Sequence, residues 1–312
     1  MRIGVFIGDV SGGRTSIADL VERARWAEDN GFAAGWLPHM PWSLDALTGV
    51  ALAGQATARI ELGTAVVPTY PRHPMAMAQQ AMTAQAAAGG RLTLGIGPSH
   101  PGVIEGMYGL KYDRPAAHVR EYVEVLRAAQ RGGMERISHH GELYTTEALL
   151  DVPGGSPYPI LVAALAPLML KLAGELADGT ITYWADERAV GDHIVPRITA
   201  AAEAAGRPAP RVVVGLPVAI VDDADAAREK AARMFAMYDS IPAYQRVLTL
   251  GDAGAPANVA LIGDEKTVAA RLKAYADAGG TDLIAAPLGL GTDRAESLAR
   301  TEEFLIALAG KP

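Results

Sequence analysis

Cysteine is absent from the 312-residue sequence, which excludes disulfides, thiolate metal ligands and a cysteine nucleophile. Clustered positive charge is also absent, and the formal net charge is −7, so neither a nucleic-acid partner nor a polybasic membrane anchor is expected. The longest largely apolar stretch, residues 158–170, contains Pro159 and Pro167 and is shorter than the ~18 residues of a membrane span. Residues 1–8 are too short for a signal peptide, so we expect a cytoplasmic protein without a membrane partner.

The sequence also lacks the short motifs of several enzyme classes. It contains no Walker phosphate-binding motif and no H-E-x-x-H zinc motif. The run G-P-S-H-P at 97–101 departs from a nucleophile elbow, because Pro101 stands where the last glycine belongs. His139 and His140 are adjacent, and adjacent side chains on a strand point to opposite faces, so we expect no metal site there.

Half of the residues are hydrophobic and a fifth are charged, a composition typical of folded globular proteins. Short apolar runs alternate with stretches of helical periodicity, which is typical of parallel βαβ units. Ser16 and Asp19 resemble a helix capping box. We predict strands at 2–8, 33–37, 60–67, 91–96, 160–164, 179–183, 212–221 and 283–287, and helices at 15–30, 43–58, 74–88, 116–131, 168–177, 186–205, 225–237 and 265–278.

This pattern and length predict an α/β protein with a closed (β/α)8 (TIM) barrel, a single domain over residues 1–312. An open doubly wound sheet is the alternative, weakened because the turn at 8–12 lacks the dinucleotide fingerprint. Three connections are long, at about 97–115, 132–157 and 238–258. We expect the first and third at the C-terminal face of the barrel, where active sites are built, and a small hairpin within the second.

His39 follows the strand predicted at 33–37 and therefore lies where barrel chemistry is located. A loop or helix-capping histidine is the simpler interpretation. Trp36 and Trp42 flank His39 and suit an aromatic wall for a planar ring, although aromatic core residues are commoner.

Four segments occur in an order that resembles one enzyme family. They are G-T-A-V-V-P-T-Y-P-R-H-P at 63–74, G-G-R-L-T-L-G-I-G at 89–97, P-I-L-V-A-A-L-A-P at 159–167 and L-A-G-E-L-A-D-G at 172–179. Together they resemble the bacterial luciferase-like superfamily of flavin and deazaflavin oxidoreductases, over nearly the whole chain. The segment Y-D-S-I-P-A-Y at 238–244 is similar to the actinobacterial branch that uses the deazaflavin coenzyme F-420.

The resemblance implies a coenzyme ring in the C-terminal mouth of the barrel, backed by a bulge with a non-proline cis peptide at Ala65–Val66. It implies that His39 is the catalytic residue near the reactive edge of the ring and that backbone amides of two loops hold the coenzyme phosphate. The implied cofactor-binding residues are His39, Thr64, Ala65, Val66, Gly97, Pro98, Ser99, Ala164, Leu165 and Ala166. Candidates for the anionic tail are Arg14 and Arg72, and candidates for substrate binding are Trp42, Tyr70, His100, Tyr238 and Tyr244.

Three positions depart from the family pattern. Leu165-Ala166 replaces a pair of glycines, Pro98 lacks an amide donor, and His100 takes a position that is often acidic. The resemblance implies hydride transfer between coenzyme F-420 and a small organic substrate, in a homodimer. An FMN-dependent monooxygenase and a coenzyme-binding barrel without catalysis are the alternatives.

Overall fold

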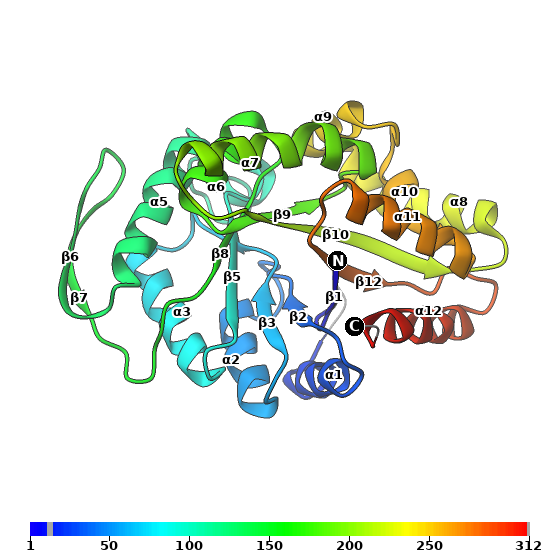
Figure 1. Ribbon diagram of the computed structural model, residues 1–312, viewed down its shortest axis with the longest axis horizontal. Helices are drawn as coiled ribbons and strands as arrows, with labels where there is room; N and C mark the ends of the chain where they lie inside the picture. Colours follow the sequence, from blue (N-terminus) through cyan, green and yellow to red (C-terminus); the bar gives the residue numbers. More distant parts are fainter. Residues whose placement is uncertain (11–14, 311–312) are drawn as a thin grey trace.

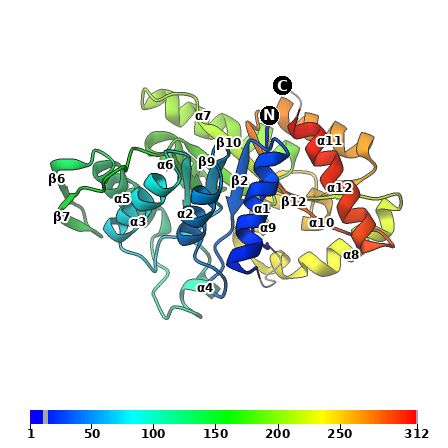
Figure 2. The ribbon, with the colours of Figure 1, turned by 90° about the horizontal axis from the view of Figure 1, so that it is seen from below.

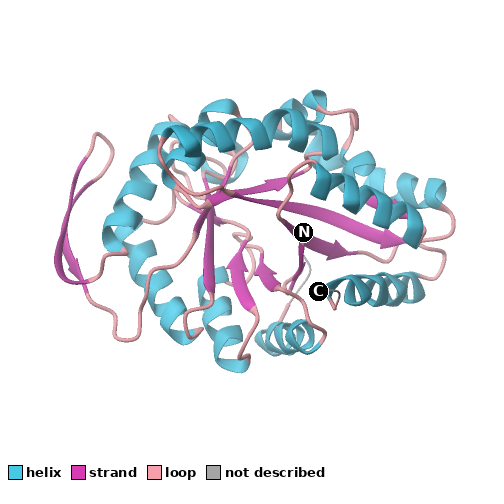
Figure 3. Cartoon of the chain, in the orientation of Figure 1, coloured by secondary structure: helices cyan, strands magenta, loops and turns pink. Residues whose placement is uncertain are grey.

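The chain folds into a closed barrel of parallel strands surrounded by helices (Figures 1 and 3). The computed structural model describes residues 1–10 and 15–310. The barrel strands are β1 (Arg2–Phe6), β2 (Ala34–Leu37), β3 (Glu61–Thr64), β5 (Leu92–Gly97), β8 (Ile160–Ala163), β9 (Gly179–Tyr183), β10 (Arg211–Ile220) and β12 (Asp282–Pro287). Because β1 pairs with β12 and β9 pairs with β10, the sheet closes on itself. The predicted (β/α)8 architecture is confirmed, and the open doubly wound alternative is wrong.

Most of the helices cover the outside of the barrel (Figure 2). The helices of the described chain are α1 (Ile17–Asp29), α2 (Ala46–Ala56), α3 (Pro74–Ala87), α4 (Pro101–Ile104), α5 (Pro115–Ala129), α6 (Pro167–Leu176), α7 (Val195–Ala204), α8 (Ala224–Phe235), α9 (Pro242–Leu250), α10 (Pro256–Val259), α11 (Glu265–Asp277) and α12 (Arg294–Ala309). The expected capping box starts α1, since the Ser16 hydroxyl accepts from the Asp19 amide and the Asp19 carboxylate accepts from the Ser16 amide. Local sequence signals therefore set the start of this helix.

One large ring fills the middle of the barrel. Trp36 on β2 is fully buried. A Cβ atom at Gly63 would lie 2.3 Å from its ring, and one at Gly4 would lie 2.9 Å from its Nε1, so glycines on both neighbouring strands make room for the indole. The other buried members of this interior core are Phe6, Ala34, Leu161, Ile181, Val213, Ile284 and Ala286. The packed interior leaves the mouth as the place for ligands.

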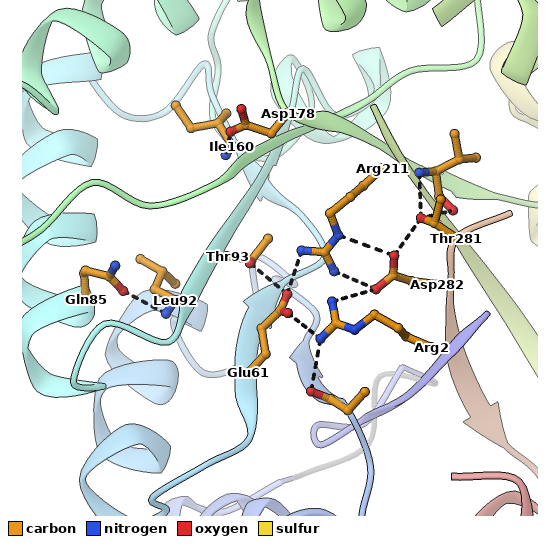
Figure 4. A network of polar contacts seen from close by, with 12 residues as sticks. Arg2, Glu61, Gln85, Leu92, Thr93, Ile160, Asp178, Arg211, Thr281 and Asp282 are labelled. Atoms are coloured by element: carbon orange, nitrogen blue, oxygen red, sulfur yellow. Dashed lines mark hydrogen bonds and ion pairs between the residues drawn. The ribbon is translucent and has the colours of Figure 1, made fainter. Parts of the chain in front are cut away.

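Charged side chains close the N-terminal end of the barrel (Figure 4). Arg211 on β10 donates to Asp282 at 2.7 Å and to Glu61 at 2.9 Å. Arg2 donates to the same two carboxylates at 3.1 and 2.7 Å, and Thr93 donates to Glu61 at 2.8 Å. Asp282 is only 3% exposed. This N-terminal network therefore ties together the starts of strands that are far apart in the sequence.

Several elements differ from the predictions. The strand predicted at 60–67 ends at Thr64 and resumes as β4 (Val67–Pro68), which pairs with β5. The helix predicted at 186–205 begins with a π-helical turn, η1 (Ala189–Ile194), before α7. The connection at 238–258 is largely helical rather than irregular, because η2 (Ala236–Ser240), α9 and α10 occupy it. The sequence predictions missed β11 (Leu261–Gly263) and α12.

The hairpin expected within 132–157 is confirmed. Strands β6 (Gly133–His140) and β7 (Thr145–Leu150) pair antiparallel and stand at the side of the molecule beyond α5 (Figure 1). Among the described residues, no helix has the length and apolar character that crossing a membrane requires.

Candidate active site

The third barrel strand is interrupted at the mouth of the barrel. A non-proline cis peptide joins Ala65 to Val66 between β3 and β4, which confirms the expectation drawn from the resemblance. Both side chains are partly buried and pack against the interior core. Thr64 Oγ1 donates to the Gly95 carbonyl at 2.8 Å and accepts from the Gly95 amide at 2.9 Å. A Cβ atom at Gly95 would lie 2.0 Å from the Thr64 carbonyl oxygen, so this close approach of β5 requires glycine.

His39 lies just beyond β2, with 8% of its side chain exposed. Its Nδ1 accepts a hydrogen bond from the Ala46 amide at 3.3 Å, so the neutral ring carries its proton on Nε2. Burial and then the Arg72 guanidinium lower the pKa of His39, against the opposing effect of the Asp45 carboxylate 3.8 Å away. His39 is therefore neutral at neutral pH. It caps the start of α2, as the simpler interpretation held, and still has an Nε2–H group that no described residue accepts from.

Two carbonyl groups of the loop after β5, those of Gly97 and Ser99, accept hydrogen bonds. Gly97 O accepts from the Thr69 amide at 3.0 Å and from Thr69 Oγ1 at 3.3 Å. The Tyr112 hydroxyl donates to Ser99 O at 3.3 Å. By contrast, the amides of Ser99 and His100 donate to no described residue. The loop therefore offers two free amide donors beside carbonyl groups that already accept hydrogen bonds.

In the loop after β8, too, carbonyl groups accept hydrogen bonds while amide groups have no partner among the described residues. His193 Nε2 donates to Leu165 O at 2.8 Å, and the Leu170 amide donates to Ala166 O at 2.9 Å. The amides of Leu165 and Ala166 have no acceptor among the described residues. We call residues 97–100 and 164–166 the amide loops.

The two amide loops are neighbours at the mouth, because β5 pairs with β8. A Cβ atom at Gly97 would lie 2.9 Å from Ala163 Cβ and 3.1 Å from a methyl group of Val66. Glycine at this position therefore lets the first loop approach both the second loop and the interrupted strand. Pro98 lies between Gly97 and the free amides of the first loop and offers no amide of its own.

Aromatic rings gather at the end of β9. Tyr183, the last residue of β9, lies two positions after the interior residue Ile181 and so shares its face of the strand. The ring centroids of Tyr238 and Tyr244 lie 6.1 and 6.5 Å from that of Tyr183. His100 meets Tyr244 edge-on at 5.3 Å. The structure thus brings together three predicted substrate residues, and we call them with Tyr183 the aromatic wall.

The sequence predictions missed Tyr183, although the alternation of side chains along 179–183 contained the signal. They also expected Tyr70 near the substrate. Its ring stacks on His118 at 3.8 Å, and its hydroxyl donates to the Asp113 carbonyl. Burial raises the pKa of Tyr70 to about 12. Trp42 is 56% exposed and contacts no other aromatic ring of the described chain.

Two arginines, Arg14 and Arg72, were predicted to bind the anionic tail of the coenzyme. Arg14 lies outside the described residues. Arg72 pairs with Asp45 and also donates to Gln80 at 3.3 Å. The charge of Arg72 is therefore balanced by a carboxylate beside His39.

The adjacent histidines of the hairpin have separate carboxylate partners. His139 Nε2 lies 3.7 Å from Glu121, and His140 Nε2 lies 2.7 Å from Glu147. Within 1–10 and 15–310, no group of three or more histidine or acidic side chains is arranged to hold a metal ion.

Two mycobacterial proteins are similar to this chain in sequence. An uncharacterized protein of Mycobacterium bovis is 31% identical over 245 residues, 74% of this chain and 72% of the relative. A putative coenzyme F-420-dependent oxidoreductase of Mycobacterium tuberculosis is 34% identical over 177 residues, 53% of this chain and 51% of the relative.

Solved structures show the same fold. An F-420-dependent secondary alcohol dehydrogenase, in complex with an F-420–acetone adduct, matches with a TM-score of 0.80 at 20% identity, covering 100% of this chain and 99% of that chain. A family model of luciferase-like monooxygenases matches residues 1–282. The chain therefore belongs to the luciferase-like monooxygenase family.

Proposed function

We propose that this protein is an oxidoreductase that transfers a hydride between coenzyme F-420 and a small organic substrate. One observation carries the proposal: the interrupted strand at Ala65–Val66 lies beside two loops whose amides have no acceptor in the described chain. Backbone amides without partners are a natural site for phosphate. These residues therefore fit a coenzyme with a flat ring and a phosphate group. A relative named for dependence on F-420 supports this choice over FMN, which has the same two features.

In this proposal the chain binds and orients, and the bound deazaflavin supplies the carbon that carries the hydride. Thr64, Ala65 and Val66 support the ring, and the amide loops hold the phosphate. His39 donates a hydrogen bond from Nε2 at the ring edge or relays a proton to the substrate. The aromatic wall and Trp42 contact the substrate and exclude water.

Titration of the purified protein with F-420 and with FMN, side by side, tests the coenzyme. We expect F-420 to bind at least about tenfold more tightly, a difference of about 1.4 kcal/mol. Reduced F-420 should then lose its hydride when an organic acceptor is added. Tighter binding of FMN with oxygen consumption would favour the monooxygenase, and F-420 binding without transfer to any acceptor would favour a non-catalytic barrel.

The low pKa of His39 predicts a particular pH profile. Protonation would place a proton on Nδ1 and remove the acceptor of the Ala46 amide. Because burial keeps the pKa of His39 below its ordinary value, kcat/KM should fall on acidification only at a pH below that at which an ordinary histidine becomes protonated. Initial rates at a series of pH values, for wild type and His39→Asn, check this. A fall that persists unchanged in His39→Asn would assign it to another group.

A larger side chain at Ala65, where the ring is proposed to rest, should weaken coenzyme binding. Ala65→Leu adds volume where the mouth meets the packed interior, and added volume in packed sites costs about 1–3 kcal/mol, or roughly five- to hundredfold in Kd. Fluorescence titration with F-420 measures the change. Ala58→Leu, at an exposed position, is the matched control. Equal affinity in both variants would show that the ring lies elsewhere.

The homodimer implied by the resemblance is also part of the proposal. Light scattering coupled to gel filtration measures the mass of the particle, and 32.6 kDa would contradict it. The cytoplasmic location stays a prediction.

A further inference from the structure

Two buried histidines lie behind the amide loops. His118 on α5 is 6% exposed and His193 in the π-helical turn η1 is 5% exposed. His193 Nε2 contacts Leu165 O at 2.8 Å. His118 Nε2 contacts Thr69 Oγ1 at 2.9 Å. Each histidine therefore reaches one amide loop, directly or through one hydroxyl.

One tautomer of His118 fits all of the contacts around its ring. The single hydroxyl proton of Thr69 goes to Gly97 O, so Thr69 Oγ1 accepts from His118 Nε2–H. His118 Nδ1 then accepts from the Tyr144 hydroxyl, 3.3 Å away on the β6–β7 hairpin. Burial lowers the pKa of His118 to about 4, against the opposing effect of the Glu121 carboxylate, so the ring stays neutral at neutral pH. Hydrogen bonds through the side chains of Tyr144, His118 and Thr69 thus connect the hairpin to the first amide loop.

His193 acts on the second loop without an intermediary. A carbonyl oxygen can only accept, so the contact with Leu165 O requires the proton on His193 Nε2. π-Helical turns are often found at functional sites, and here such a turn carries the histidine that reaches the mouth. Both loops are therefore held through a carbonyl group, Gly97 O or Leu165 O, while the amides of Ser99, His100, Leu165 and Ala166 donate to no described residue.

We propose that His118 and His193 are positioning residues, which hold the two amide loops so that their amides receive the phosphate of the coenzyme. The proposal rests on the proposed function, because it assigns how that site is built. A positioning role for the two histidines predicts a different result from a role in core packing alone. Loss of either donor should affect recognition of the phosphate and leave recognition of the ring unchanged.

The test compares two ligands that differ only in the phosphate. Both carry the deazaflavin ring of F-420 on a ribityl chain, which ends in a phosphate in one ligand and in a free hydroxyl in the other. Replacing the donor with a leucine, in His118→Leu or His193→Leu, should weaken binding of the phosphorylated ligand about tenfold and change the affinity for the phosphate-free ligand less than about twofold. The glutamine variants, which keep an N–H donor, should recover most of the affinity for the phosphorylated ligand.

Thr69 gives a second pair of variants with a smaller risk to folding. Thr69→Val keeps the shape and removes the hydroxyl, and Thr69→Ser keeps the hydroxyl. We expect weaker F-420 binding in the valine variant alone. His139→Leu is the matched histidine control, because His139 is partly buried beside Glu121 and touches neither loop.

The binding results distinguish a failure of the histidine assignment from a failure of the proposed function. Equal losses for both ligands in the leucine and valine variants, or no loss for either, would overturn the assignment of His118 and His193. The same affinity of the wild type for both ligands would also overturn it, because the phosphate would then make no contact. A wild-type protein that binds neither ligand would contradict the proposed function itself.

Discussion

Replacing His39 with alanine is expected to lower the rate constant of hydride transfer by about 10²–10⁴-fold, the range typical of removing a positioned proton donor or acceptor. The affinity for F-420 should change much less. His39 contributes one Nε2–H group at the mouth, whereas the proposed binding contacts come from the interrupted strand and the amide loops. Single-turnover kinetics at saturating coenzyme, with Kd from absorbance titration, separates the two quantities.

A matched histidine variant controls for this result. His140 is exposed on the hairpin and contacts Glu147, so His140→Ala should transfer hydride at the wild-type rate. Loss of F-420 affinity in step with the rate would make His39 a binding residue. A wild-type rate in His39→Ala would remove it from the mechanism.

Replacing Arg211 with methionine is expected to lower the free energy of unfolding by about 1–3 kcal/mol, the cost typical of leaving buried polar groups without one of their hydrogen-bond partners. The change would leave Glu61 and the nearly buried Asp282 with Arg2 as their remaining cation. Urea denaturation measures the loss. At temperatures where the variant is folded, its affinity for F-420 should match the wild type, because the N-terminal network lies at the end of the barrel opposite the mouth.

A surface ion pair provides the control for this prediction. Arg228 pairs with Asp225, which is 97% exposed, and such pairs contribute less than about 1 kcal/mol. Arg228→Met should therefore barely change the urea midpoint. Similar losses for Arg211→Met and Arg228→Met would mean that the N-terminal network adds nothing beyond ordinary surface charge.

The barrel strands and most helices were predictable because their signals are local. Side-chain periodicity and the capping pair Ser16–Asp19 act within a few residues of one another. The segment 238–258 was less predictable because its helical turns are short and start at Pro242 and Pro256. The interruption at Ala65–Val66 was expected only from the family resemblance. No local sequence rule predicts a cis peptide bond between two residues that are not proline.

The candidate site was predictable in part. His39 and three members of the aromatic wall follow from their places after strands or in long connections. Tyr183 was recoverable from the alternation along its strand. The environment of Tyr70 was not, because its stacking partner His118 lies 48 positions later, on α5.

The sequence alone determined the alternation of strands and helices, the exclusion of cysteine chemistry and the candidate histidine, because each of these depends on residue type and short spacing. Only the tertiary structure decided which amides at the mouth lack an acceptor, which histidines stand behind them, and how Arg2, Glu61, Arg211 and Asp282 meet. These partners are distant in sequence, and closing the barrel is what brings them within hydrogen-bonding distance.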